Sequence, residues 1–98
     1  MAALEQRLFD SGMPVAALME KVGLSMAAWL LQRGDLLRHG VGVLVGPGHN
    51  GGDGLVVARE LHLAGIEVSL WCPLPICKIL TAEHLRHGEW LGLRQLIE

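Results

Sequence analysis

The fold is decided by residues 41–72, which read VGVLVGPGHNGGDGLVVARELHLAGIEVSLWC. Residues 41–45 form a short, continuous apolar run, which is typical of a strand buried on both faces of a parallel sheet. Residues 46–54 are rich in glycine and predict a loop, and residues 55–64 resume helical spacing. Residues 66–71 alternate like a second strand. The order strand, glycine loop, helix, strand predicts a right-handed βαβ unit over residues 41–72.

The flanking segments read as helices. Residues 3–11 predict a short helix, and apolar residues at helical spacing predict a second helix from Pro14 up to Gly34. We therefore expect a helical arm over residues 1–36. Thr81 is the expected N-cap of a last helix over residues 81–91.

Two strands that are buried on both faces need more sheet beside them. We therefore expect residues 1–98 to be the amino-terminal part of one larger α/β domain. Its expected architecture is a Rossmann-like, three-layer α/β/α fold with a parallel sheet that is incomplete in this chain.

Composition narrows the class of protein. The chain has 98 residues, of which 51% are apolar and 18% charged, so it is one domain or less and too hydrophobic to be disordered. A net charge of −2 argues against nucleic acids and anionic membranes as partners. No apolar run reaches the roughly 18 residues that a membrane span needs. With two cysteines and no signal-like amino terminus, we expect a reducing, cytoplasmic location.

The glycine loop is the candidate binding site. It follows a predicted strand and precedes a predicted helix, where backbone amides and the positive helix end attract an anion such as a phosphate. The spacing of Gly46, Gly48 and Gly51 matches the dinucleotide fingerprint. Two features disfavour an ordinary dinucleotide fold: residues 52–54 delay the helix, and residues 71–72 are Trp-Cys where a ribose-binding acid is expected. It is not a P-loop, because no Gly-Lys-Ser/Thr follows.

The string GPGHNGGDGLVVAR at residues 46–59 resembles the signature of the YjeF amino-terminal domain, the NAD(P)H-hydrate epimerases. The resemblance extends to Glu5, Phe9, residues 12–13 and residues 18–20, and so covers nearly the whole chain. Those enzymes interconvert the epimers of hydrated NADH and NADPH, so that a partner dehydratase can restore the nucleotides. The usual signature has two asparagines where this chain has His49 and Asn50.

The resemblance implies that His49, Asn50, Gly51, Gly52 and Asp53 line the substrate site. It also implies that Asn50 contributes to a potassium site, since an amide oxygen is a suitable ligand for an alkali cation. In that family the other potassium ligands and the catalytic carboxylate come from segments after this region. No catalytic residue is therefore assigned within the chain, and we expect weak binding and little turnover from it. The candidate partners are hydrated NADH or NADPH, the dehydratase and a second copy of the chain.

The site residues also have structural interpretations. Asp53 can cap a helix that begins near Leu55, and Asn50 can be a turn residue with left-handed backbone angles. His49 can be a solvent-exposed polar residue rather than an acid or base.

Outside the loop, the structural interpretation is favoured over a metal site. His84 and His87 share a helix face with Glu83 nearby, but without a third convergent ligand they are expected to be solvated. Cys72 and Cys77 lack zinc spacing and are expected to fill apolar space.

Two other functions remain open. The first is a non-catalytic interaction module of the same fold, as in domains attached to mRNA-decapping scaffolds. The second is an NAD-dependent oxidoreductase domain. Retention of residues 50–53 disfavours the module, and the delayed helix with the missing acid disfavours the oxidoreductase.

Overall fold

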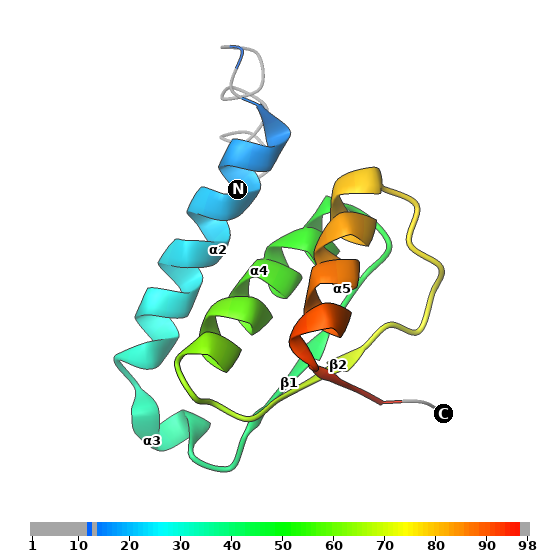
Figure 1. Ribbon diagram of the computed structural model, residues 1–98. Helices are drawn as coiled ribbons and strands as arrows, with labels where there is room; N and C mark the ends of the chain where they lie inside the picture. The colour runs from blue at the N-terminus through cyan, green and yellow to red at the C-terminus, as the bar shows by residue number, and fades with distance from the viewer. Residues whose placement is uncertain (1–11, 13, 97–98) are drawn as a thin grey trace.

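The computed structural model describes residue 12 and residues 14–96. Within them, helices alternate with parallel strands after an initial pair of helices (Figure 1). The elements in chain order are α2 (Val15–Leu31), α3 (Gly34–Leu37), β1 (Val41–Leu44), α4 (His49–Leu63), β2 (Val68–Trp71), α5 (Ile79–Leu91) and β3 (Arg94–Gln95). The helix predicted over residues 3–11 lies outside the described residues.

The three strands form one parallel sheet in the order β1-β2-β3. Val41 pairs with Val68, and Ser69 pairs with Arg94. The Leu96 amide extends the last pairing by donating to the Leu70 carbonyl at 2.7 Å. The βαβ unit is confirmed. The third strand goes beyond the two that the sequence predicted, because a two-residue strand carries too little hydrophobic pattern to be recognised.

The helices α2, α4 and α5 lie on the same side of the sheet, with α4 between the other two (Figure 1). The core between this layer and the sheet includes the fully buried side chains of Val45, Leu61 and Leu70. An α/β fold with a parallel sheet, as predicted, is therefore confirmed. In the described part of the chain the fold has two layers, the sheet and the helices on one side of it. The second helical layer of the predicted α/β/α arrangement is not present among these residues.

The second face of the sheet is uncovered in the described residues. Leu44, Trp71 and Leu96 project from this face, with 62%, 37% and 44% of their surface exposed. They line a hollow of about 280 Å³ together with Gly42 and Ser69. The expectation that the first strand is buried on both faces is thus wrong for the described chain. The apolar side chains of β1 lie on both faces of the sheet. In the described residues, helices cover only one of these faces.

The predicted helix after Pro14 is confirmed as α2, which ends at Leu31, three residues before Gly34. A short helix, α3, follows and was not predicted. Gly23 lies where α2 crosses α4, and a Cβ there would overlap the side chain of Val56. Close helix packing therefore explains a glycine inside a helix, at a position where propensity disfavours it by about 1 kcal/mol.

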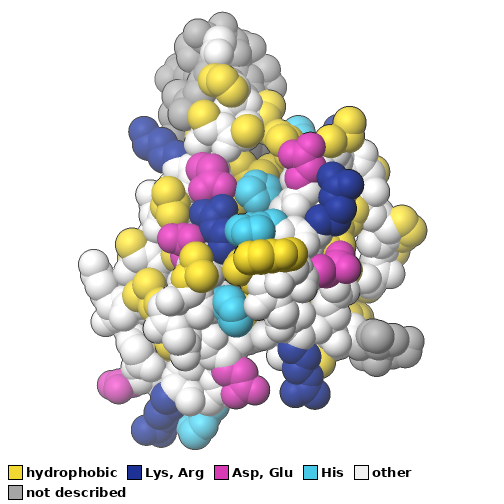
Figure 2. All heavy atoms as spheres, viewed as in Figure 1, with side chains coloured by type: hydrophobic (Ala, Val, Ile, Leu, Met, Phe, Trp, Pro, Cys, Tyr) yellow, Lys and Arg dark blue, Asp and Glu magenta, His cyan; other side chains and the backbone are white. Residues whose placement is uncertain are grey.

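The helical face carries charges of both signs. Acidic, basic and histidine side chains alternate across it with apolar ones, and no single charge dominates (Figure 2). Among the helices that the structure describes, none combines the length and the apolar character needed to cross a bilayer.

Candidate functional site

The candidate site is the turn between β1 and α4. The strand ends at Leu44, Val45 is fully buried, and α4 begins at His49 with Gly48 as its N-cap in an extended conformation. The helix thus starts six residues before Leu55, where the sequence predicted it. The predicted nine-residue loop is a short turn over residues 45–48 followed by the first turns of a helix. The helix is therefore not delayed, and that reason for disfavouring a dinucleotide fold is wrong.

Glycines in the first turns of α4 allow close approach rather than unusual backbone angles. A Cβ on Gly51 would overlap the carbonyl oxygen of Gly46 and lie 3.0 Å from its carbonyl carbon. A Cβ on Gly52 would overlap the end of Met19 in α2 and lie 3.0 Å from the Thr81 hydroxyl in α5. The glycines with positive φ in the described residues are Gly12, Gly40, Gly65 and Gly92, outside this turn. The amino end of α4 is therefore enclosed on several sides by backbone and helices.

Hydrogen bonds from the segment before α5 and from α5 itself hold the turn. The Thr81 hydroxyl donates to the Gly48 carbonyl at 2.9 Å, and Thr81 is fully buried. Cys77 donates to the Pro47 carbonyl from its amide at 3.0 Å and from its thiol at 3.2 Å. Neither contact could be inferred from the sequence, since the partners are 30 or more residues apart.

The predicted site residues separate into two groups. His49 is half-buried and Asn50 is exposed, and they are the first two residues of α4. Asp53 lies one turn later on the same helix face and is half-buried. Gly51 and Gly52 are buried, so they shape the end of the helix and offer no side chain to a ligand.

The amides at this end of α4 are suited to an anion. Gly51 donates its amide to the Gly48 carbonyl at 3.2 Å. The amides of His49 and Asn50 precede that bond, at positions where a helix has no intrahelical acceptor. The partial positive charge of a 15-residue helix is concentrated at the same place.

Three structural interpretations from the sequence are wrong. Asp53 does not cap a helix at Leu55, because it is the fifth residue of α4. Asn50 does not adopt left-handed angles, since no described non-glycine residue has positive φ. Thr81 is not an N-cap: α5 begins at Ile79 with Lys78 as its cap, and the Thr81 hydroxyl bonds to the turn instead.

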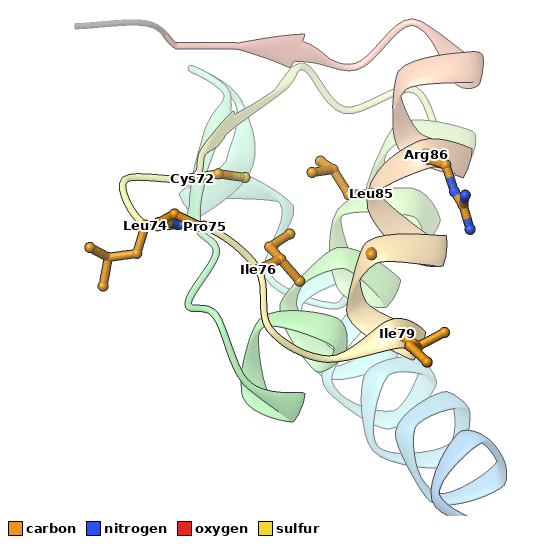
Figure 3. A pocket seen from close by; sticks show the side chains of 8 residues that line it. Cys72, Leu74, Pro75, Ile76, Ile79, Leu85 and Arg86 are labelled. Atoms are coloured by element: carbon orange, nitrogen blue, oxygen red, sulfur yellow. The ribbon is translucent and has the colours of Figure 1, made fainter.

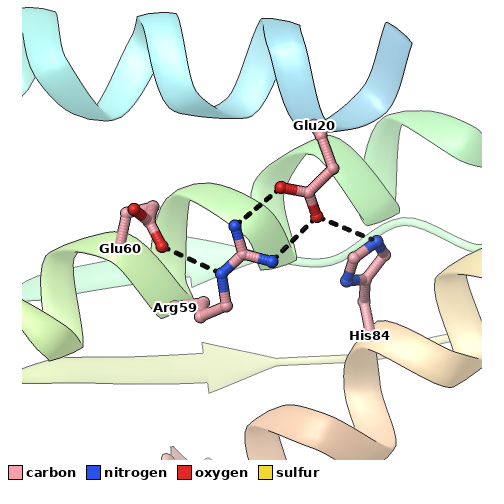
Figure 4. A network of polar contacts seen from close by, with 4 residues as sticks. All are labelled: Glu20, Arg59, Glu60 and His84. Carbon is pink, nitrogen blue, oxygen red and sulfur yellow. Dashed lines mark hydrogen bonds and ion pairs between the residues drawn. The ribbon is translucent and has the colours of Figure 1, made fainter. Parts of the chain in front are cut away.

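A polar cluster near the site joins the three helices (Figure 4). Arg59 of α4 donates two hydrogen bonds of 2.8 Å to the two carboxylate oxygens of Glu20 in α2. Its Nε donates to Glu60 at 2.9 Å. His84 of α5 lies 3.9 Å from the Glu20 carboxylate. The paired fork geometry fixes α2 against α4 with α5 close by, and sequence spacing gave no sign of it.

The cluster shifts the pKa values of two groups. Hydrogen bonding to Arg59 lowers the pKa of Glu20 in spite of partial burial, and the charges of Arg59, His84 and His87 act in the same direction. Burial lowers the pKa of His84 and outweighs the opposing charge of Glu20, and the positive charges of Arg59 and His87 act in the same direction as burial. The folded chain therefore favours a charged Glu20 and a neutral His84.

We predict that the free energy of unfolding falls as the pH is lowered from 7 to 4. The unfolded chain binds protons more readily at both groups, so stability decreases below about 6.5 through His84 and again below about 4.5 through Glu20. Urea unfolding at a series of pH values measures this effect. His84→Asn should remove the loss that begins below about pH 6.5, and Glu20→Gln the loss that begins below about pH 4.5. An unchanged pH profile in both variants would contradict the assignment.

An apolar pocket lies beside the turn, between α5 and the segment that follows β2 (Figure 3). Its volume is about 520 Å³, and its lining contains Cys72, Leu74, Ile76 and Leu85, with Arg86 as the one charged residue. This lining is unsuited to a polar nucleotide as a whole. Cys72 is half-buried, as expected of an apolar filler, whereas Cys77 is exposed and bonded to the turn.

The described residues contain no group of three histidine, cysteine or acidic side chains placed to hold a metal ion. The imidazole of His87 stacks on Trp90 at a centroid distance of 6.2 Å. His84 faces Glu20 at 3.9 Å. The two histidines of α5 therefore make separate contacts: His87 is exposed, as expected, whereas His84 is half-buried rather than solvated.

The chain is similar to a known protein family and to named relatives. The family described as YjeF-related protein N-terminus matches residues 15–96. A bifunctional NAD(P)H-hydrate repair enzyme Nnr of Synechocystis sp. is 53% identical over 94 residues, which cover 95% of this chain and 18% of the relative. An NAD(P)H-hydrate epimerase of Roseobacter litoralis is 36% identical over 97 residues, which cover 95% of this chain and 43% of the relative.

The fold has a close counterpart among solved structures. The crystal structure of the yeast protein YNL200c superimposes with a TM-score of 0.80 and 28% identity. The match covers 97% of this chain and 43% of the yeast chain. The Rossmann-like prediction is thus confirmed. The chain spans less than half the length of each of these three relatives.

Proposed function

Because the chain belongs to the YjeF-related N-terminal family, we propose that it is the amino-terminal part of an NAD(P)H-hydrate epimerase. In this proposal the turn before α4 binds the diphosphate of hydrated NADH or NADPH. The reaction is epimerisation at the hydrated carbon of the nicotinamide ring. Relatives that match most of this chain carry the names of NAD(P)H-hydrate enzymes, which supports the substrate class.

The amino end of α4 is the observation that carries the proposal. It follows the carboxyl end of β1 directly, and ligands of open α/β sheets bind outside the carboxyl ends of their strands. His49 and Asn50 bring amides without intrahelical acceptors to this edge. A diphosphate there would accept hydrogen bonds from these amides and would be stabilised by the helix dipole.

The side chains of this edge add to the binding chemistry. We propose that the Asn50 amide oxygen is one ligand of a potassium ion; it is exposed at the same end of α4, and its chemistry fits a hard cation. A bound potassium ion would supply positive charge beside the diphosphate. His49 can donate a hydrogen bond to the nucleotide. The proton transfer itself is assigned to a carboxylate from a later segment of the protein, so this chain binds and orients the substrate.

The wider context is also part of the proposal. The substrate would pass to a dehydratase, in keeping with relatives that are named bifunctional repair enzymes. A second copy of the chain is a candidate partner. Cys72 and Cys77 are free thiols, which agrees with a reducing, cytoplasmic location.

Calorimetry tests this function. The chain should bind hydrated NADPH more tightly in potassium chloride than in choline chloride, and the unhydrated nucleotide should bind more weakly. Equal binding of NADPH and its hydrate without an effect of potassium would favour an oxidoreductase domain. The absence of nucleotide binding would favour the interaction module.

We predict that Asn50→Ala weakens binding of hydrated NADPH about tenfold and removes its potassium dependence, because one polar contact to a charged ligand is lost. Stability should be unchanged or slightly higher, since Asn50 is exposed and alanine is the better helix former. Ser25→Ala, an exposed position in α2, is the matched control and should leave binding unaltered. Retained potassium dependence in Asn50→Ala would contradict the role of Asn50.

A further inference from the structure

The turn before α4 has little within itself to fix its conformation. Gly46 and Gly48 carry no side chains, and a Cβ at either position would meet nothing within 4 Å. A turn of this composition loses much conformational freedom when it becomes ordered. Apart from the Gly51 amide, which donates to the Gly48 carbonyl, the hydrogen bonds that orient it come from elsewhere in the chain.

Those groups come from one short segment, residues 77–81. The Pro47 carbonyl accepts the amide and the thiol of Cys77, and the Gly48 carbonyl accepts the hydroxyl of Thr81. Three donors thus reach two consecutive carbonyls. The turn is held from the side of α5.

The direction of the carbonyls sets the direction of the amides. In a planar trans peptide the C=O and the following N–H point opposite ways, and the described chain has no cis peptide. The peptide that gives its carbonyl to Cys77 carries the amide of Gly48. The peptide that gives its carbonyl to Thr81 carries the amide of His49. Both amides therefore point away from α5.

Building on the proposed function, we propose that Thr81 is the positioning residue of the diphosphate site. Cys77 supports it by holding the neighbouring Pro47 carbonyl. The buried hydroxyl of Thr81 fixes the Gly48 peptide, so that the amides of Gly48 and His49 are already aimed at the phosphate oxygens before the nucleotide binds. Ordering the donors in advance removes an entropy loss from the binding step.

The Thr81 hydroxyl lies in a closely packed place between α4 and α2. The missing Cβ of Gly52 opens the space beside the hydroxyl, and Met19 closes it from α2. The same carbonyl of Gly48 also accepts the Gly51 amide, so it keeps a partner if the hydroxyl is removed. Thr81→Val should therefore change the orientation of the turn more than the stability of the chain.

Amide resonances in a titration with inorganic pyrophosphate provide the test. In the unmodified chain, pyrophosphate should shift the amides of Gly48 and His49 in a saturable way. Thr81→Val, which keeps the shape and loses the donor, should weaken binding about tenfold and reduce both shifts. Thr81→Ser should restore binding to within about threefold. Leu37→Ala, a buried position in α3 at the opposite end of β1 from the turn, controls for a general loss of stability and should leave the shifts intact.

The outcomes separate a failure of this inference from a failure of the proposed function. If the unmodified chain shows no shift, the proposed function and this inference both fail. If it binds and Thr81→Val binds equally well, the inference fails and the proposed function stands. If Thr81→Val does not fold, Thr81→Ala serves instead, because it also removes the hydroxyl that donates to the Gly48 carbonyl. Pyrophosphate binding by Thr81→Ala as tight as that of the unmodified chain would then overturn the inference.

Discussion

Gly51→Ala should destabilise the chain by about 3 kcal/mol and abolish diphosphate binding. The added Cβ would overlap the Gly46 carbonyl, which is backbone and cannot rotate away as a side chain could. Overpacking a well-packed site costs about 1–3 kcal/mol, and a backbone obstacle puts this position at the upper end. Relief would require the turn to move off the end of α4, which would displace the amides of Gly48 and His49.

The direction of this effect is informative. Glycine to alanine inside a helix normally stabilises by about 1 kcal/mol, so a net loss identifies the close contact as its cause. Urea unfolding measures the change. Gly42→Ala is the control: a Cβ there meets nothing within 4 Å, and stability should stay the same or rise by up to about 1 kcal/mol. A Gly51→Ala chain as stable as the unmodified one would show that the turn does not pack on α4 in this way.

Gly23→Ala should destabilise the chain by about 2 kcal/mol. A Cβ on this residue of α2 would overlap Val56 of α4, which is fully buried and β-branched and so has no free rotamer. The two helices would have to separate where they cross. Because Glu20 reaches Arg59 from the preceding turn of α2, its paired hydrogen bonds should weaken as well.

A double variant tests the cause. Val56→Ala alone should destabilise the chain by about 2 kcal/mol through loss of buried surface. Combined with Gly23→Ala it should cost clearly less than the sum, because the smaller side chain makes room for the new methyl group. Thermal unfolding of the four proteins gives the coupling energy. Additive losses, to within about 0.5 kcal/mol, would contradict a direct contact between these positions.

The sequence predicted those helices and strands whose apolar residues recur in a clear pattern. The apolar spacing after Pro14 predicted α2, and the runs at 41–45 and 66–71 predicted β1 and β2. The start of α4 could not be predicted in this way, because residues 49–54 contain three glycines and have low helix propensity. Tertiary contacts at Gly51 and Gly52 select the helix there. The short elements α3 and β3 carry too few residues for a pattern.

The candidate site was partly predictable. Its glycines and its position between a strand and a helix predict an anion site from the sequence. The groups that hold the turn were not predictable, since Thr81 and Cys77 reach it from 30 or more positions away. The same is true of the Glu20–Arg59 pair, whose members are 39 positions apart. Local chemistry is visible in a sequence, whereas the support that orients it depends on the fold.

A crystal structure of the chain with hydrated NADPH tests the central claim most directly. The account predicts diphosphate oxygens within about 3.2 Å of the amide nitrogens of Gly48, His49 or Asn50, in front of the first turn of α4. A nucleotide bound instead to the open sheet face beside Trp71, or in the apolar pocket beside Leu85, would contradict it.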